Sequence, residues 1–441
     1  MSGIAQLLLL RGIKVTGSDL KESKITEELK SLGAQVFLGH NPANIKGADL
    51  VVYSSAVKED NVEIQEAKKL GIPLIKRAEA LSQLMKDKVV ITVTGSHGKT
   101  TTTSLVSYLL LEAGFVPTVA IGGILKNIDT NAYLGNSDFF VAEADESDGS
   151  FLCYQPRYSI ITNIDYEHLD YYKEFNNEIN AFKEFLNKTE SNGCAFCCDD
   201  DINLKDILKD YKKRYVLFGL KESAHIYPKN IEMQGLTSEF DCIYKNKFLA
   251  RFCLALGGVH NISNALAVIA LGLELGIDLE FIKRTLTHYK GTRRRMEVKF
   301  SNDKFLLIDD YAHHPTEIKA TLAAIKNLKS NRIIAVFQPH RYTRTKLLLE
   351  EFAHSFDLVD HLILTDIYAA SEPPLEGVTS MSIYDRIKEC APDRKIDFLA
   401  KEKIAEHLLS IIKPGDLVIT LGAGDIFKTG DELAEELKGK I

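Results

Sequence analysis

The sequence predicts an α/β protein of three domains. Short apolar strand patterns alternate with helical patterns along nearly the whole chain, which is typical of parallel sheets covered by helices. The chain has 441 residues, more than one hydrophobic core normally organises. Charged stretches at 86–88 and 293–295 interrupt the alternation, and they divide the chain into residues 1–87, 88–296 and 297–441.

The central domain is predicted to be a parallel sheet of the phosphate-loop ATPase type with a small antiparallel part. Its first strand is the apolar run from Val89 to Val93, and a helix starts at Lys99. Glycines between them allow backbone N–H groups to approach phosphate oxygens, the lysine neutralises terminal phosphates, and a hydroxyl can hold Mg²⁺. A chance Gly-Lys-Thr in an ordinary turn is the alternative, and the flanking strand and helix argue against it. The nucleotide-binding candidates are Gly95, Ser96, His97, Gly98, Lys99, Thr100 and Thr101.

Two acidic segments, 143–148 and 163–170, each follow an apolar strand of the same domain. The carboxyl ends of parallel strands meet at one edge of a sheet, so both segments are expected near the phosphate loop. Mg²⁺ takes only one or two carboxylates from a protein. Glu146 is the stronger candidate ligand, whereas a solvated loop explains Glu143 equally well. His168 fits a second metal or phosphate contact as well as an ordinary surface or core position.

The end of the central domain is richer in turns. From Cys194 to Phe252 the strands are short, which favours an antiparallel appendage. A helix follows Gly257, and its apolar positions form one stripe. The run Cys194-Ala-Phe-Cys197-Cys198 has no second ligand pair at a matching distance, so a buried strand is favoured over a metal site. The seven cysteines are odd in number and scattered, which indicates reduced thiols in a cytosol.

The N-terminal domain is predicted to be Rossmann-like, with ligand loops where its strands end, near Ser18-Asp19 and Ser54-Ser55. Its beginning is unusual, because Ile4–Leu10 already has a helical pattern where a first strand and a glycine-rich turn are expected. A missing central strand would leave ladder groups of two neighbours unpaired, each costing about 1–3 kcal/mol if buried. We therefore expect that this sequence starts at an internal methionine and that the natural domain has the strand.

The C-terminal domain is predicted to be a second Rossmann-like unit, because five apolar strands alternate regularly with helices. The loop 309–317 follows its first strand and carries Asp310 with two adjacent histidines, of which at most one is expected to share a site with it. In the loop 338–345, Arg341 and Arg344 are three residues apart, which suits capture of a carboxylate or phosphate. Cations are unfavourable at a helix start unless an anion is bound. The run 422–424 fits a tight turn.

The composition excludes several classes of protein. The net charge of −7 and the isoelectric point near 6.0 argue against nucleic acid as a partner. The arginine run 293–295 is too short for a polyanion surface and favours a local anion site. The apolar stretches are far shorter than a membrane span, so no membrane insertion is expected.

Six motifs together resemble the Mur ligase family over essentially the whole chain: TGSHGKTTT, EADESDGSF, TNIDYEHLD, GGVHNISNALA, DDYAHHPTEI and FQPHRYTRT. The resemblance implies a cytoplasmic, ATP-dependent ligase of peptidoglycan precursor synthesis that works through an acyl phosphate. Ser147 and the FQPHR segment favour addition of L-alanine to UDP-N-acetylmuramate over recycling of a murein tripeptide. A phosphate-loop motor or switch and a non-catalytic nucleotide-binding remnant are the alternatives from other classes.

The resemblance also implies roles for individual residues, with ATP and two Mg²⁺ ions as cofactors and a monomer or homodimer as the assembly. Its catalytic residues are Lys99, Glu146, His168 and Arg344, and its metal ligands are Thr100, Glu146 and His168. Its further ATP contacts are Asn261, Asn264, Arg295 and Asp310. The implied substrate residues are Ser18, Asp19, His40, Ser54, Ser55, His314, His340, Arg341 and Arg344. Some relatives use a carbamylated lysine near the second metal, for which Lys183 is the position available here.

Overall fold

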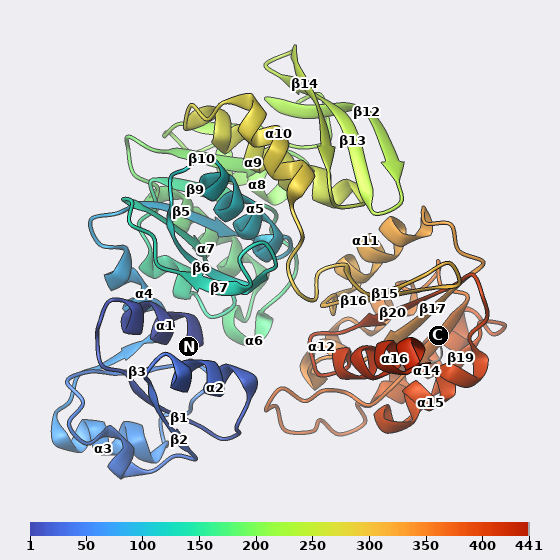
Figure 1. The fold of residues 1–441 in the computed structure, drawn as a ribbon, viewed down its shortest axis with the longest axis horizontal. Helices are drawn as coiled ribbons and strands as arrows, with labels where there is room; N and C mark the ends of the chain where they lie inside the picture. The colour runs from blue at the N-terminus through green and yellow to red at the C-terminus, as the bar shows by residue number, and fades with distance from the viewer. Residues whose placement is uncertain (440–441) are drawn as a thin grey trace. The chain divides into compact units, whose positions relative to one another are not determined.

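The computed structural model describes residues 1–439, and Figure 1 traces the chain from its N-terminus in blue to its C-terminus in red. The chain forms two compact units. One unit comprises residues 1–227, 244–246 and 264–285, and the other comprises 228–243, 247–263 and the chain from 286 onward. Helices alternate with mainly parallel strands, so the predicted α/β class is confirmed.

The N-terminal segment forms two small parallel sheets. Within residues 1–439, β1 pairs only with β2, and β3 pairs only with β4. The helix boundaries follow from local sequence, because the Ser23 side chain caps α2, the Asn61 side chain caps α3, and Gly71 ends α3 with a φ of 67°. The elements are α1 (Ser2–Leu10), β1 (Thr16–Asp19), α2 (Lys24–Ser31), β2 (Gln35–Leu38), η1 (Pro42–Ile45), β3 (Val51–Tyr53), α3 (Val62–Leu70), β4 (Leu74–Lys76) and α4 (Arg77–Met85).

The largest sheet has ten strands in the order β14-β13-β12-β11-β10-β9-β5-β8-β6-β7. Its strands are β5 (Val89–Thr94), β6 (Thr118–Leu125), β7 (Thr130–Tyr133), β8 (Phe139–Glu143), β9 (Tyr158–Ile161), β10 (Cys194–Cys198), β11 (Tyr215–Phe218), β12 (Ile226–Gln234), β13 (Thr237–Tyr244) and β14 (Lys247–Leu254). The accompanying helices are α5 (Lys99–Glu112), η2 (Ser150–Cys153), α6 (Leu169–Tyr172), α7 (Phe175–Lys188), α8 (Ile202–Leu208), α9 (Val259–Glu274) and α10 (Leu279–His288).

The parallel part of this sheet is larger than the sequence predicted. β10 and β11 were expected in an antiparallel appendage, but β10 pairs in parallel with both β9 and β11. The reason is burial, since all five residues of β10 are buried, as they are in a central parallel strand. The cysteines of β10 thus lie in a buried strand, as predicted. Antiparallel geometry is confined to β6–β7 and to β12–β14, whose last turn places Lys245 and Asn246 at positive φ, as a two-residue hairpin needs.

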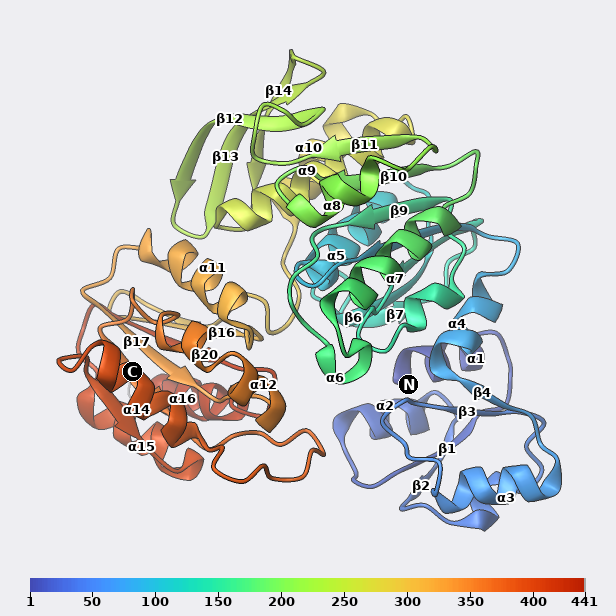
Figure 2. The same ribbon diagram turned by 180° about the vertical axis from the view of Figure 1, so that it is seen from behind.

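Helices cover both faces of the parallel strands. α5 packs on β5, β6 and β8, and Figure 2 shows α7 on the opposite face. Under α7, Phe151 of η2 stacks on Phe185 with ring centroids 4.9 Å apart, and it meets Phe182 edge-on at 5.3 Å. These contacts fix the chain just after the first acidic segment, 143–148.

The C-terminal sheet has six strands in the order β15-β16-β20-β17-β18-β19, and only the edge strand β15 is antiparallel to its neighbour. Its strands are β15 (Glu297–Ser301), β16 (Phe305–Asp310), β17 (Arg332–Phe337), β18 (His361–Leu364), β19 (Ile396–Phe398) and β20 (Asp416–Leu421). Its helices are α11 (Pro315–Lys326), α12 (Tyr342–Leu347), α13 (Leu349–Ala353), α14 (Ser380–Cys390), α15 (Lys401–Ile411) and α16 (Phe427–Gly439).

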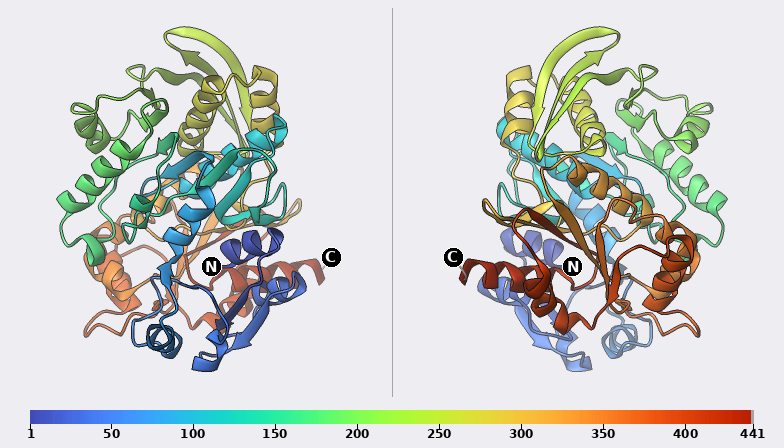
Figure 3. Two further views of the ribbon diagram at one scale, coloured as in Figure 1. Left: turned by 90° about the vertical axis from the view of Figure 1, so that its left-hand side faces the viewer. Right: turned by 90° about the vertical axis from the view of Figure 1, so that its right-hand side faces the viewer.

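Separate apolar clusters lie on the two faces of this sheet. One cluster joins α11, α13 and α14 to the sheet, and the other joins α15 and α16 to the opposite face. α16 lies along that face in Figure 3. α12 and α13 are separated at Leu348, which leaves the helical conformation with a φ of −111°.

Replacing Phe337 by alanine is expected to destabilise the C-terminal sheet by about 3–5 kcal/mol, because its buried ring packs against Phe352 and Phe356. The measurement is the urea midpoint of the unfolding transition that includes this sheet. Phe248→Ala is the matched control, since that ring is 64% exposed and its loss should leave the midpoint nearly unchanged. Equal midpoints for both variants would contradict this assignment of the core.

Candidate active site

The glycines of the phosphate loop are required by its conformation. Gly95 has a φ of 128°, and a Cβ at this position would lie 2.2 Å from the hydroxyl oxygen of Thr162. Gly98 has a φ of 83°, and its Cβ would lie 2.7 Å from Oδ1 of Asn264. Both positions combine a left-handed backbone with a close approach, so only glycine fits them without strain. The loop thus passes directly beneath the residues that follow β9.

The segment after β9 holds the loop in place. The backbone N–H groups of Ser96 and His97 donate to the carbonyl and side-chain oxygens of Asn163, at 3.0 and 2.8 Å. Thr162 donates to the carbonyl of His97, and the N–H of Asp165 donates to the Ser96 hydroxyl at 2.7 Å. The sequence analysis missed these supports, because their role depends on pairing between β5 and β9. The result is a loop whose shape is set before any ligand binds.

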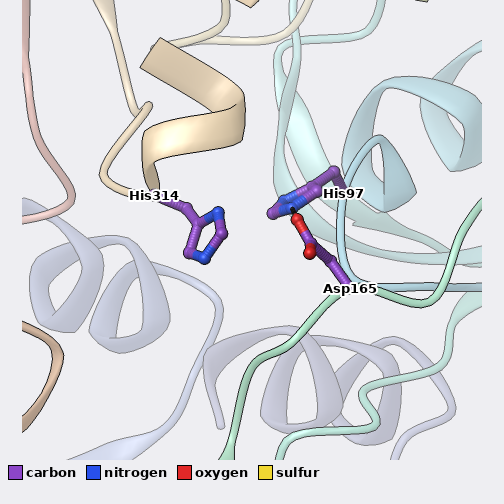
Figure 4. A group of neighbouring side chains, drawn as sticks. All are labelled: His97, Asp165 and His314. Carbon is purple, nitrogen blue, oxygen red and sulfur yellow. Dashed lines mark hydrogen bonds and ion pairs between the residues drawn. The ribbon is translucent and has the colours of Figure 1, made fainter. Parts of the chain in front are cut away.

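His97 is held by an acidic partner. Its Nε2 lies 2.8 Å from Oδ2 of Asp165, and Figure 4 shows the two side chains facing one another. Asp165 belongs to the second acidic segment, so the expectation that this segment lies beside the phosphate loop is met by a direct contact. The carboxylate therefore orients the imidazole of His97.

Lys99 is the central charge of the loop. Its ammonium donates to the carbonyl oxygens of Gly95 and Ser96 and to Oε1 of Glu146, at 2.6, 3.1 and 2.6 Å. Burial by itself would lower the pKa of Lys99, but Glu146 and Asp145 outweigh it and raise that pKa above its ordinary value. The side chain is therefore a permanent cation aimed across the loop. This is the property that a clamp for phosphate oxygens needs.

Four further groups gather around Lys99. Nε2 of His168 lies 3.2 Å from Oε1 of Glu146, and the Thr100 hydroxyl donates to Oε1 of Glu143 at 3.0 Å. Glu143 also accepts from the N–H of Gly122 at 2.8 Å, so it is an anchored residue rather than a solvated one. These groups form two pairs, Thr100 with Glu143 and His168 with Glu146, and hydroxyl and carboxylate oxygens are the ligand types that a hard divalent cation prefers.

Two other ionisable residues near this set, Arg77 and Glu178, had no signal in the sequence. Arg77 of α4 lies 3.8 Å from Oδ2 of Asp145, which brings the N-terminal segment to the acidic turn. Glu178 of α7 is fully buried. Burial raises the pKa of its carboxyl to about 9, and the charges of Glu146 and Glu167 act in the same direction. Glu178 is thus an uncharged acid beneath the candidate site.

The candidate substrate residues of the N-terminal segment lie in two separate groups. The Ser18 hydroxyl donates to Oε2 of Glu63 at 2.6 Å, and Nδ1 of His40 lies 3.0 Å from that hydroxyl. Asn44 donates to the other oxygen of Glu63 at 2.7 Å. Glu63 was missed because it lies inside α3, more than twenty residues from either partner. The Asp19 carboxylate accepts from the nearby backbone N–H of Lys21 at 3.1 Å.

Ser54 and Ser55 follow β3, which belongs to the other small sheet. The Ser54 hydroxyl accepts from the N–H of Ala56 at 3.3 Å, a contact within its own turn. The structure therefore brings Ser18 and His40 together around Glu63, whereas Ser54 and Ser55 follow a strand of a different sheet. A single continuous pocket formed by all five residues stays a prediction.

The C-terminal unit places its candidates around an arginine that the sequence analysis did not select. Arg294 donates to the carbonyls of Gly422 and Gly424, lies 3.3 Å from Oδ2 of Asp309, and stacks against Tyr311 at 4.9 Å. The turn at 422–424 therefore serves as an acceptor for this side chain. These contacts fix the arginine run beside the first strand of the sheet.

The next two candidates of this unit are Arg295 and Asp310. The Arg295 guanidinium lies over the Tyr311 ring at 4.9 Å and 3.8 Å from Oε1 of Glu317. The carboxylate of Asp310 accepts from the N–H groups of Met296 and Ala312, at 2.7 and 2.8 Å. Burial raises the pKa of Asp310 to about 6, against the opposing effect of Arg295.

The imidazoles of the two adjacent histidines have different partners, and the expectation that at most one of them shares a site with Asp310 stays a prediction. Nδ1 of His313 lies 3.1 Å from Oε2 of Glu317. His314 is buried at the start of α11, where its Nδ1 accepts from the N–H of Thr316 at 3.4 Å. The two imidazoles therefore do not act as one pair.

The loop after β17 forms a stack of rings with arginines beside it. His340 stacks on Tyr368 with centroids 5.7 Å apart, and Nη1 of Arg344 lies 3.2 Å from Nδ1 of His340. Burial lowers the pKa of His340 to about 3, and His313 and Arg344 act in the same direction. Arg341 has a φ of 70° and lies 4.0 Å from Glu372.

The remaining candidates have local contacts. Asn261 donates to the carbonyl of Gly257 at 2.8 Å, and Asn264 lies against Gly98 of the phosphate loop. Thr101 is buried in the first turn of α5. Lys183 lies on α7, where its ammonium contacts Asp210 at 2.8 Å and both side chains are exposed. A carbamate at Lys183 would be repelled by that carboxylate.

Three protein families match this chain, and each covers a different part. They are "Mur ligase family, catalytic domain" at residues 1–89, "Mur ligase middle domain" at 93–272 and "Mur ligase, glutamate ligase domain" at 294–424. Together they cover most of the sequence. The chain belongs to the Mur ligase family.

Named relatives match it along its whole length. The chain is 48% identical to a UDP-N-acetylmuramate–L-alanine ligase of Geotalea daltonii, over 99% of this chain and 96% of the relative. It is 47% identical to the enzyme of that name from Sulfurihydrogenibium, over 100% and 96%. Among solved structures it is similar to a UDP-N-acetylmuramate–alanine ligase from Thermotoga maritima, with 28% identity, a TM-score of 0.86, and coverage of 100% and 97%.

A murein peptide ligase from Psychrobacter arcticus is also similar, with a TM-score of 0.74 and 25% identity, covering 100% of this chain and 97% of that one. Between residues 1 and 439, the structure has no helix with both the length and the apolar character needed to cross a bilayer.

The buried acid Glu178 predicts a pH-dependent stability. Between about pH 4.5 and 9 the unfolded chain ionises this carboxyl while the native chain retains its proton, so native stability falls as the pH rises. The slope is at most roughly 1.4 kcal/mol per pH unit. Glu178→Gln is expected to remove that decline in the metal-free protein, measured by urea unfolding at pH 5, about 7 and about 9.

Glu184→Gln is the matched control, since Glu184 lies on the same helix with a side chain that is 59% exposed. It should leave the wild-type pH dependence intact. A Glu178→Gln variant with the wild-type slope would show that Glu178 is ionised in the native protein.

Proposed function

We propose that this chain is an ATP-dependent ligase that joins L-alanine to the lactyl carboxylate of UDP-N-acetylmuramate in peptidoglycan precursor synthesis. The reaction releases ADP and phosphate, and it takes place in the cytoplasm. The observation that carries the proposal is the partly buried Lys99 ammonium, held between two loop carbonyls and Glu146 at the start of α5. The full-length identity with relatives of that name supports this choice of substrates.

Each of the three domains predicted from the sequence is proposed to bind a different substrate. Residues 1–87 bind the UDP-sugar, 88–296 bind ATP, and 297–441 bind the amino acid and close over ATP. In the first domain, Ser18 and His40 are the candidates for contact with the UDP group, and their shared partner Glu63 orients them. Asp19, Ser54 and Ser55 are the remaining candidates in that domain.

In the central domain, the loop 95–101 surrounds the triphosphate and Lys99 contacts its terminal phosphates. Thr100, Glu146 and His168 are the proposed ligands of two Mg²⁺ ions, and the contact between Thr100 and Glu143 supports Glu143 as a further ligand. When bound, Mg²⁺ supplies charge neutralisation for the phosphoryl group in transfer. Asn261 and Asn264 are proposed to contact adenine.

In the C-terminal domain, Arg295 and Asp310 are proposed to contact the nucleotide. His314, His340, Arg341 and Arg344 are proposed to position L-alanine and the muramoyl group. Two arginines beside a neutral imidazole suit a carboxylate, because the guanidinium groups supply the charge and the ring accepts or donates a single hydrogen bond. The assembly is proposed to be a monomer or a homodimer.

The chemistry then has two steps. A lactyl carboxylate oxygen attacks the γ-phosphorus of ATP, the bond to the bridging oxygen of the β-phosphate breaks, and ADP leaves from an acyl phosphate. The deprotonated amine of L-alanine attacks the acyl carbon, the bond to the phosphate oxygen breaks, and the amine proton passes to water. Lys99 stabilises the charge on the transferred group throughout the first step.

ADP release in the presence of UDP-N-acetylmuramate is expected to require an amino acid and to be greatest with L-alanine. A coupled assay that scans single amino acids and the murein tripeptide measures this directly. Preference for the tripeptide would move the chain to the recycling branch. ADP release without any acceptor would indicate a motor or switch, and release of AMP would contradict the acyl-phosphate route.

Lys99→Ala is expected to lower kcat by roughly 10²–10³-fold or more, because it removes the cation that faces the transferred phosphoryl group. Lys183→Ala is the matched control, and it should retain near wild-type turnover because its ammonium pairs with an exposed carboxylate. Wild-type turnover of Lys99→Ala would exclude the proposed clamp. A large loss in Lys183→Ala would restore the carbamylated-lysine alternative.

A further inference from the structure

The C-terminal domain contains a second cluster of ligand-type side chains, at the end of the sheet opposite its loops. Nε2 of His361 lies 2.7 Å from Oδ2 of Asp397, and Nε2 of His407 lies 3.3 Å from the same oxygen. All three ligand atoms lie within 4.8 Å of one another. His361 is the first residue of β18, whereas the candidate substrate loops follow the carboxyl ends of these strands.

Strand pairing and packing in the domain core bring the three residues together. β18 pairs in parallel with β19, with Ile363 opposite Asp397. His361 lies two residues before Ile363, so His361, Ile363 and Asp397 project from the same face of the sheet. α15 covers this face, with Leu408 in the same apolar cluster as Ile363, and it carries His407. Figure 1 labels β19 and α15 in this part of the molecule.

Hydrogen bonds account for only part of the cluster, namely the pair of His361 and Asp397. Nε2 of His407 is buried and makes no hydrogen bond to any residue in the range 1–439, although it lies 3.3 Å from the carboxylate. His361 is 1% exposed, and its Nδ1 also lacks a hydrogen-bond partner among the described residues. A buried polar atom without a partner normally costs free energy. A bound cation would give the His407 nitrogen a partner.

The spacing fits a small transition-metal ion. Ligand atoms at about 2.0–2.2 Å from a tetrahedral metal lie about 3.3 Å from one another. The contact between His407 and Asp397 has that value and the contact between His361 and Asp397 is shorter at 2.7 Å, so an ion could be accepted with small side-chain movements. Imidazole with carboxylate selects Zn²⁺ and its neighbours rather than Mg²⁺ or Ca²⁺, which prefer oxygen.

Solvent reaches part of the cluster. The side chains of Asp397 and His407 are 37% and 30% exposed, so water can reach the site and complete the coordination.

We propose that His361, Asp397 and His407 form a binding site for a divalent transition-metal ion of the Zn²⁺ class, separate from the candidate active site. The ion would join the three-residue edge strand β19 to β18 and α15. Its role is to stabilise this edge of the C-terminal sheet, and it takes no part in the ligase reaction.

The test is titration of the chelator-treated full chain with ZnCl₂ in excess Mg²⁺, by calorimetry and by thermal unfolding. The wild type should bind one ion at this site and unfold at a higher temperature with zinc. Asp397→Asn and His407→Gln should weaken that binding at least about tenfold and abolish the increase in Tm. His354→Gln, a histidine substitution at an exposed position of the same domain, should behave as the wild type.

Equal zinc affinity in all four proteins would overturn the proposal, and so would absence of tight binding in the wild type. If a variant does not fold, zinc binding by the wild type still tests the proposal. X-ray absorption at the zinc edge should show two imidazoles, one carboxylate and no sulfur. A sulfur neighbour would place the ion on the cysteines and overturn the assignment.

Discussion

The ion pair between Lys99 and Glu146 is the interaction on which the candidate active site depends. Glu146 is fully buried, and a buried carboxylate is tolerated only when a cation and hydrogen bonds compensate for its lost hydration. Lys99 needs the same compensation. Each charge therefore keeps the other in place. A ligand that carries its own negative charge can take over the role of the carboxylate toward Lys99 and release Glu146 to a cation.

The backbone around this pair is fixed from outside the phosphate loop. Asn163 binds the loop at two N–H groups, and Thr162 and Asn264 leave room for nothing larger than glycine beneath it. These contacts come from the neighbouring strand and from the helix α9. The loop geometry is therefore a property of the whole sheet edge, and the Gly-Lys-Thr motif is only its most visible part.

The sequence was informative where chemistry lies in one continuous segment. The phosphate loop, the acidic turn with Glu146 and the alternation of strands and helices each have a local pattern. Glu63, Glu178 and Arg294 could not be found in this way, because each acts on partners that only the tertiary structure brings near. The strand β10 was assigned to the wrong kind of pairing, since short buried strands give the same pattern in parallel and antiparallel sheets.

The neutral state of His340 has a consequence for how the C-terminal loops attract a ligand. An imidazole whose pKa lies near 3 carries no charge at physiological pH, so His340 itself adds no positive potential and the neighbouring guanidinium groups supply it. Guanidinium groups do not titrate in that range. Their attraction for an anion should thus respond to ionic strength, through a screening length of about 8 Å in physiological salt, and not to acidity.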